Sequence, residues 1–335
     1  MMKYNATIFL LVTLLLGGTY VSYAQGCSDA GFCTMGAMKP GQSYNKKVKL
    51  KLRSIEVSYY RGESTLTPVI FVANIDAAIS ITKNLGMQIK LPYQWVTGAF
   101  DDTGGMGDIS ISATQRVLNK EKFDLNVSIG AKIPTNDSNM KSSGKKQPES
   151  KGLPLPMYYQ TSLGSYDVIA GASVLSSKWM FATGIQIALT ENKNDYWPEG
   201  WRPPVWPEWA YTDKYDRATN LHRGIDVMLR VERTFRFSNF SFNIGVLPIY
   251  RITKDEVDKT GLSDEGKEVR LGTGEREKLE GTTGLALTLL AGFAYQFNTS
   301  NSVALSYGKK LTDRNVNPDG LTRVQVFTVA YGFRF

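Results

Sequence analysis

The last nine residues, FTVAYGFRF (327–335), decide the fold, because large apolar side chains alternate along them with small or polar ones. One face carries Phe327, Val329, Tyr331, Phe333 and Phe335, and the other carries Thr328, Ala330, Gly332 and Arg334. Alternation with a period of two is typical of a β-strand whose two faces meet different surroundings. The sequence therefore predicts a strand at this end of the chain.

The same alternation recurs upstream, for example over 123–133 and 285–297. Segments of this kind have about the ~9–11 residues that a strand needs to cross a membrane. The segment 158–175 is long enough to include part of a loop before Tyr166. Twelve strands are predicted in all: 50–60, 69–83, 86–97, 107–118, 123–133, 158–175, 178–190, 221–234, 240–251, 281–297, 301–311 and 322–335.

The connections between these segments alternate between long links and short turns that contain Asn, Gly or Ser. Transmembrane barrels of the bacterial outer membrane have short periplasmic turns and longer external loops. An even number of strands then places both termini in the periplasm. We therefore expect an all-β fold, a transmembrane antiparallel up-and-down β-barrel formed by residues 50–335.

Aromatic residues gather near the ends of the predicted strands, where amphipathic rings favour the headgroup level of a membrane. The external set is Tyr59, Tyr60, Tyr93, Trp95, Tyr158 and Tyr159, and the periplasmic set is Phe123, Trp179, Phe235, Phe237, Phe240, Phe297 and Phe335. We therefore expect the apolar face to point toward lipid. A soluble barrel or sandwich, with that face inside, is the alternative. The terminal Phe335 is typical of the signal that barrel assembly machinery recognises.

Residues 1–24 have the features of a secretory signal peptide, with Lys3 before a short apolar core and small residues at Ser22 and Ala24. Residues 25–49 would then form a periplasmic N-terminal segment. Cys27 and Cys33 are expected to form a disulfide in an oxidising compartment. Lipidation of Cys27 is the alternative, although the residues before it make a poor lipobox.

The formal net charge is +8, and much of it lies between residues 39 and 53. A solvated tail beside anionic lipid is expected there, since no nucleic-acid module accompanies it. The sequence has no phosphate loop, nucleotide fingerprint or zinc spacing, so neither a cofactor nor a metal is expected. Outer-membrane phospholipases share this size, but His222 is followed by Arg-Gly and no serine lies near it on its own strand, so we expect no enzyme.

Inward positions of the strands carry charges of both signs that would line a solute path: Asp76, Lys90, Asp108, Arg116, Asp124, Lys132, Asp167, Asp226, Arg230 and Glu232. One hypothesis is that Arg116, Lys132 and Arg230 line that path opposite the acidic set. The alternative is that these charges pair and fill a narrow barrel.

The predicted loop 191–220 is rich in aromatic residues, which stack well on ligands. The candidates for ligand contact are Tyr196, Trp197, Trp201, Trp206 and Trp209. A lid over the barrel mouth is an equally favoured interpretation of the same rings.

Two stretches, GMGDISISATQR (105–116) and LGSYDVIAGAS (163–173) with Trp179 after it, resemble strand openings of outer-membrane transporters grouped with the phenol-degradation meta-pathway barrel proteins. The resemblance implies a Gram-negative outer membrane and a porin-like channel or transporter for small solutes, hydrophobic or aromatic ones included. Asp108 and Asp167 would either contact solute or accept turn N–H groups. The alternative function is a non-conducting surface barrel that binds a partner or ligand through loop 191–220.

Overall fold

The computed structural model describes residues 35–39, 51–262, 268–271 and 274–335. The predicted signal peptide, Cys27, Cys33 and most of the segment 25–49 lie outside these ranges. Within the described ranges, no helix has the length and apolar character that crossing a membrane requires.

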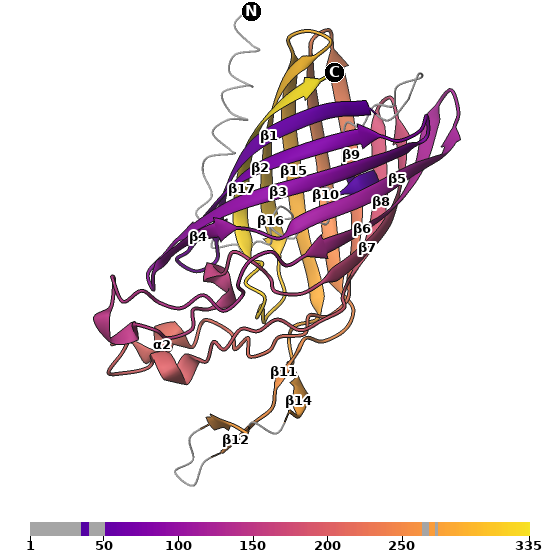
Figure 1. Ribbon diagram of the computed structural model, residues 1–335. Coiled ribbons are helices and arrows are strands. Elements are labelled where there is room, and N and C mark those ends of the chain that lie inside the picture. Colours follow the sequence, from indigo (N-terminus) through magenta and orange to yellow (C-terminus); the bar gives the residue numbers. More distant parts are fainter. Residues whose placement is uncertain (1–34, 40–50, 263–267, 272–273) are drawn as a thin grey trace, which may run out of the picture.

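Twelve long strands pair with their neighbours in antiparallel order and close into a barrel (Figure 1). Closure joins the first strand to the last, with Val57 opposite Tyr331. The strands are β1 (Lys51–Ser64), β2 (Val69–Ser80), β3 (Leu85–Thr97), β5 (Ile109–Asn119), β6 (Phe123–Ile133), β7 (Asp167–Ser176), β8 (Trp179–Ala188), β9 (Asp226–Phe237), β10 (Phe240–Arg251), β15 (Gly284–Gln296), β16 (Asn301–Thr312) and β17 (Arg323–Arg334). The predicted twelve-stranded antiparallel barrel is confirmed. The predicted strand 158–175 was wrong at its start, because residues before Asp167 form loop and 3₁₀ structure.

Several short elements lie in segments that were expected to be loops. The short strand β4 (Asp102–Met106) pairs with the outer half of β3, and β5 pairs with the other half. A projecting extension contains β11 (Glu256–Asp258) paired with β14 (Arg276–Lys278), and β12 (Thr260–Leu262) paired with β13 (Glu268–Arg270). The short helices are η2 (Gly36–Met38), η3 (Pro148–Ser150), η4 (Met157–Tyr159), η5 (Pro198–Trp201) and α2 (Trp209–Thr212).

The two faces of the barrel wall differ as the alternation predicts. Outward side chains are large and apolar, and Ile129, for example, is 62% exposed. Inward side chains are mostly polar and buried. Burial of a large apolar surface is the main favourable term in folding, so an apolar outer wall of this extent fits contact with lipid rather than with water.

Both aromatic belts are present on the outer wall, with corrections at the external end. Tyr59, Tyr93 and Trp95 are exposed there, and all seven aromatic residues predicted for the periplasmic belt are exposed at the other end. Tyr60 is only 1% exposed, because it lies on the inward face of β1, and Gly62 leaves room for its ring. Tyr158 and Tyr159 are buried in η4, inside the loops rather than in the belt.

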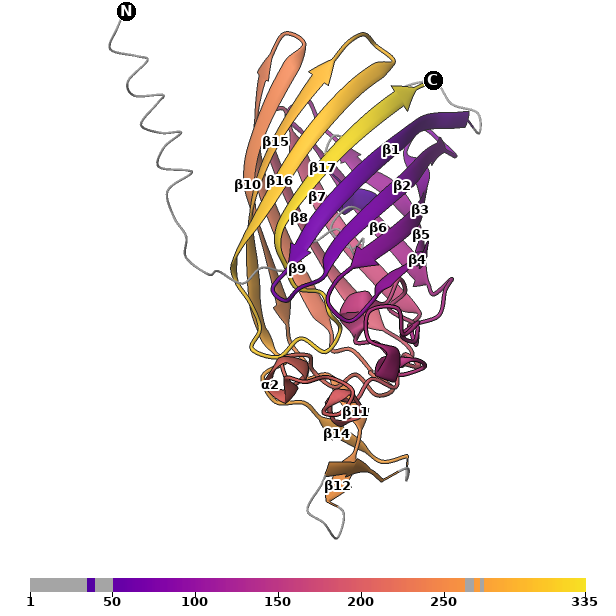
Figure 2. The ribbon, with the colours of Figure 1, turned by 90° about the vertical axis from the view of Figure 1, so that its left-hand side faces the viewer.

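The two ends of the barrel are built differently (Figure 2). The short turns lie at the end where β1 begins and β17 stops, which we call the turn end. The long loops pack together at the opposite end, which we call the loop end, and the β11–β14 extension projects beyond it. Loop rings form a buried cluster there, which we call the aromatic lid: Phe100, Tyr158, Tyr159, Tyr196, Trp201 and Tyr215.

Candidate functional site

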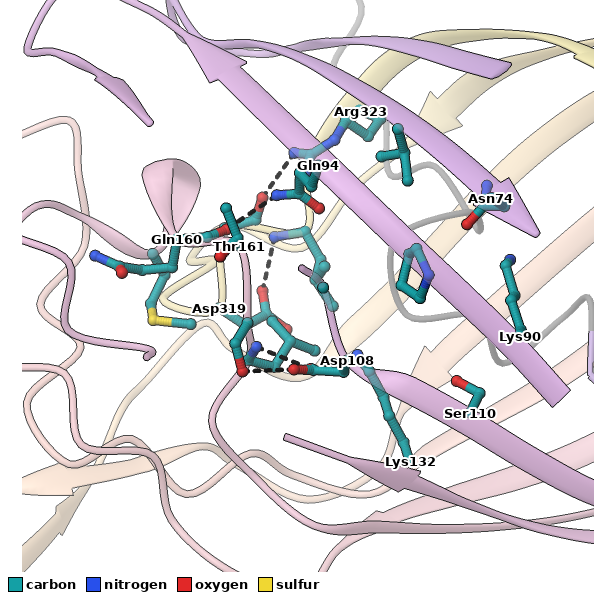
Figure 3. Close-up of a pocket in the computed structure, with 18 residues that line it drawn as sticks. Asn74, Lys90, Gln94, Asp108, Ser110, Lys132, Gln160, Thr161, Asp319 and Arg323 are labelled. Carbon is teal, nitrogen blue, oxygen red and sulfur yellow. Dashed lines mark hydrogen bonds and ion pairs between the residues drawn. The ribbon is translucent and has the colours of Figure 1, made fainter. Parts of the chain in front are cut away.

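A cavity lies inside the barrel beneath the loops and holds about 560 Å³ of space, part of it open to solvent (Figure 3). Its walls come from the inward faces of β2, β3, β5 and β6 and from loop residues 157–163 and 319–323. The polar lining is Asn74, Lys90, Gln94, Asp108, Ser110, Lys132, Gln160, Thr161, Ser162, Asp319 and Arg323, and the apolar lining is Val72, Pro92, Met157, Leu163 and Leu321. The cavity is therefore amphipathic.

Asp108 fixes one wall of this cavity. Its carboxylate accepts hydrogen bonds from Ser162 Oγ at 2.5 Å and from the Leu163 backbone N–H at 3.0 Å, and it lies 3.1 Å from Lys132 Nζ. All three contacts are buried, so the charge of Asp108 is balanced by the protein. Because Asp108 belongs to one motif-like stretch and Leu163 begins the other, this aspartate ties the two stretches together at the cavity.

Asp319 also lines the cavity and belongs to a larger network of buried charges. Its carboxylate lies 2.9 Å from Arg251 and 3.1 Å from Arg314. Arg251, which is 1% exposed, also reaches Asp226 at 2.7 Å and Asp255 at 2.8 Å. Burial raises the pKa of Asp319, but Arg314 and Arg251 outweigh it and hold this pKa below its ordinary value. Strand ends and loops are thus joined at the loop end by charges that are costly to separate.

A second buried pair supports the loop between β6 and β7. Asp167, at the start of β7, accepts hydrogen bonds from Arg223 at 2.5 Å and from Ser165 at 2.8 Å. Gln186 on β8 also donates to it. The donors to Asp167 are thus side chains rather than the turn N–H groups of the prediction, and through Arg223 this aspartate anchors the loop that precedes β9.

Residues 35–39 lie inside the barrel, where η2 packs against the inner faces of β5 to β8 (Figure 1). We call them the lumen segment. Met35 and Met38 are buried with Ile169, Met180 and Met228 in an apolar cluster on the inner wall. Lys39 Nζ lies 2.7 Å from Asp76 and 3.2 Å from Glu56. The periplasmic segment predicted at 25–49 therefore sends these five residues into the lumen, while its other residues lie outside the described part of the chain.

The predicted lumen residues fall into three groups. Lys90, Asp108 and Lys132 line the cavity. Asp76, Asp167, Asp226, Arg230 and Glu232 lie on the inner wall in ion pairs with described residues. Arg116 and Asp124 lie near the short turns, where Arg116 donates to Asn84 and Asp124 accepts from Asn119. The structure therefore does not bring Arg116 to the cavity beside Lys132.

Several site residues were not predicted. Asp319, Arg323, Gln160 and Ser162 lie in or beside loops, where no alternation marks an inward position. Lys39 was assigned to a solvated tail, and only its contacts with β1 and β2 reveal its place. Arg251 carried a usable signal, because it continues the inward parity of Leu247 and Ile249 on β10.

The rings of loop 191–220 are largely committed to protein contacts. Phe100 stacks on Trp201 with ring centroids 4.5 Å apart, and Trp206 meets Phe100 edge-on at 4.8 Å. Tyr196 is fully buried, and Trp197 stacks against Arg217. The side chain of Trp209 lies outside the described atoms. This packing matches the lid interpretation of the loop.

No family model and no curated protein matches the sequence. Among solved structures, an outer membrane channel from Pseudomonas putida F1 superposes with a TM-score of 0.55 at 13% identity, over 88% of this chain and 99% of that chain. The NanC porin (TM-score 0.44, 7% identity, 85% of this chain and 99% of that chain) and the CymD monoaromatic hydrocarbon channel (0.39, 12%, 97% of each) are more distant in shape. The first likeness confirms the barrel fold that the two motifs implied.

Proposed function

We propose that this chain is a bacterial outer-membrane channel for small solutes, closed in the described state by the lumen segment and the aromatic lid. The observation that carries the proposal is an amphipathic cavity inside a closed barrel, roofed by loops at one end. Its mixed polar and apolar lining is typical of small-molecule sites, where a few polar groups orient a ligand against apolar walls. The apolar outer wall supports a place in the membrane, and the fold shared with the Pseudomonas putida channel supports passage.

The cavity lining supports a solute with an apolar body and a polar group. Val72, Pro92 and Leu321 offer apolar surface, and Gln94 and Lys90 offer donors on the facing strand. The two cavity carboxylates, Asp108 and Asp319, are already engaged by protein cations. Three cations, Lys90, Lys132 and Arg323, line the cavity beside these two carboxylates. We infer that this excess of positive charge favours anionic or neutral solutes over cations.

The test is single-channel conductance of the refolded mature chain in a planar bilayer. We expect brief openings with a preference for anions, and we expect Lys90→Glu to shift ion selectivity toward cations. The control is Lys309→Glu, which makes the same charge change at an exposed position near the loop end of β16. A folded barrel without openings, both in the wild type and in a variant that loosens the lumen segment, would refute passage.

The alternative, a non-conducting barrel that binds a partner through loop 191–220, has a weaker basis in the structure. Two of its proposed contact residues, Tyr196 and Trp201, are buried within the lid. Their rings would have to leave stacked neighbours before they could meet a ligand.

A further inference from the structure

Arg233 is a charged residue on the outward face of the barrel wall. On β9 it follows outward Leu229 and Val231, whereas its neighbours Arg230 and Glu232 point inward. Across the sheet it is paired with Trp179 on β8 and Ile244 on β10, and both are exposed on the outer wall. A charge on a lipid-facing wall is tolerated near the headgroups and costly at the membrane centre. Its place near the turn end puts Arg233 at the headgroup level of that leaflet.

The guanidinium of Arg233 is held by two aromatic rings. Its Cζ lies 5.3 Å from the ring centroid of Trp179 and 5.0 Å from that of Phe235. Both distances are in the range of cation–π attraction. Among the described residues, none of the ion pairs or side-chain hydrogen bonds involves Arg233. A guanidinium carries five N–H donors and no acceptor, so the acceptors for its hydrogen bonds come from water or lipid outside the protein.

The surroundings of Arg233 are basic. Lys178, in the turn between β7 and β8, is exposed, and its carbonyl accepts a hydrogen bond from Thr234 at 2.7 Å. Arg236 reaches the same turn and donates to the Ser177 carbonyl at 2.6 Å. The adjoining sequence over 176–181 and 233–244 contains no Asp or Glu. Positive charge is therefore concentrated around Trp179 without a carboxylate on these segments to balance it.

We propose that Lys178, Trp179, Arg233 and Phe235 form a binding site for the headgroup of an anionic phospholipid in the leaflet at the turn end. The planar guanidinium suits a phosphate, which accepts two parallel N–H bonds from it. Lys178 supplies a second cation, and the exposed rings of Phe181 and Phe242 offer apolar surface for the acyl chains. The proposal requires the barrel to lie in a membrane, but it does not require passage of a solute.

The test is native mass spectrometry of the intact mature chain in detergent, with phosphatidylglycerol or phosphatidylcholine of identical acyl chains added. We expect one phosphatidylglycerol to stay bound under activation that removes phosphatidylcholine. Arg233→Gln should reduce the retained lipid about tenfold, and Arg233→Lys should give an intermediate value, because it keeps the charge and loses the planar fork. Lys309→Gln, an exposed position near the loop end of the barrel, should retain the lipid as the wild type does.

Three results would overturn the proposal. Full retention of lipid by Arg233→Gln would show that this residue does not hold it. Equal loss in Lys309→Gln would reveal diffuse charge attraction instead of a site. Equal retention of the two lipids would exclude recognition of an anionic headgroup. Migration of each variant on an unheated gel shows whether the barrel is folded. Conductance of Arg233→Gln tests the channel independently of the lipid, so a failure of lipid binding can be told apart from a failure of solute passage.

Discussion

Met38 occupies the space that a side chain at position 171 would need: a Cβ added to Gly171 would lie 2.5 Å from the Met38 sulfur. A similar fit exists nearby, where a Cβ on Gly130 would lie 2.9 Å from Cε of Met35. Two glycines on neighbouring strands thus leave hollows in the inner wall, and two methionines of the lumen segment fill them. The wall and the segment are complementary in shape, which indicates a defined seat for the segment.

Gly171→Ala should displace Met38 and increase the frequency of channel openings, because the added methyl group and the sulfur cannot share the same space. The measurement is single-channel recording under fixed salt. Met38→Ala removes the conflict with the sulfur and leaves the contact with the Thr183 carbonyl, 2.9 Å from the added Cβ, so adding Gly171→Ala to it should change the openings less than adding it to the wild type. Gly200→Ala is the control, since a Cβ there has open space around it. Equal effects of Gly171→Ala in both backgrounds would show that it acts on the wall and not through Met38.

Lys39→Gln should also favour the open channel. Lys39 is the charged anchor of the lumen segment, and its loss leaves the carboxylate of Asp76, 2.7 Å away, without that cation. Removing one partner of a buried pair costs roughly 3–5 kcal/mol, and partial exposure of Lys39 lowers this figure. The measurement is the open probability in a planar bilayer. Lys146→Gln, which breaks the more exposed pair with Asp102, should leave the open probability as it was.

Trp201→Ala should loosen the aromatic lid. Trp201 is almost fully buried, stacks on Phe100 and donates from its indole N–H to the Pro154 carbonyl at 2.8 Å. Loss of a buried ring of this size costs about 3–5 kcal/mol. Limited trypsin digestion reports the change, because cleavage after the exposed Lys214 should become at least about tenfold faster. Trp95→Ala on the outer wall should not alter that rate; faster cleavage in both variants would indicate general weakening of the barrel.

Asp216→Asn should stabilise the lid at neutral pH. Burial raises the pKa of Asp216 to about 6, with Asp319 and Asp255 adding to the rise, although the Asn317 N–H and Arg314 oppose it. A pKa above the unfolded value means that the folded lid holds this proton more tightly, so lid stability falls as pH rises from about 4 to 6 and stays low above that. The amide carries no such penalty and should add roughly 1–3 kcal/mol at pH 7.5 and little near pH 4.

The measurement for Asp216→Asn is the trypsin cleavage rate after Lys214 between pH 6.5 and 8, with unfolding followed by tryptophan fluorescence at lower pH. Asp213→Asn is the matched control, because Asp213 is more exposed and pairs with exposed Arg202. Its effect should stay within about 0.5 kcal/mol. If the advantage of Asp216→Asn persisted unchanged at pH 4, ionisation of Asp216 could not be its cause.

The sequence by itself determined the barrel, because local sequence patterns predict the strands, the turns and the face of each strand that points outward. The strand Phe123–Ile133 was predicted to the residue, since alternation runs along its whole length and a short turn precedes it. The outward position of Arg233 also follows from parity alone. Successive side chains of a strand point to opposite faces of the wall, one toward lipid and the next toward the lumen. Each strand of the wall therefore shows an alternation that can be recognised from neighbouring residues alone.

Only the tertiary structure decided what fills the barrel. Met38 contacts Gly171, and Arg251 pairs with Asp319, although the partners are far apart in the sequence. The residues around each of them do not predict the partner. Tyr60 and Trp201 look like belt or ligand residues in sequence and are buried, because a ring's role depends on which loop folds over it. A buried side chain or charge can pack or pair with any suitable partner that the fold brings near it. Which partner is near depends on how the closed barrel arranges its loops and its N-terminal segment in space.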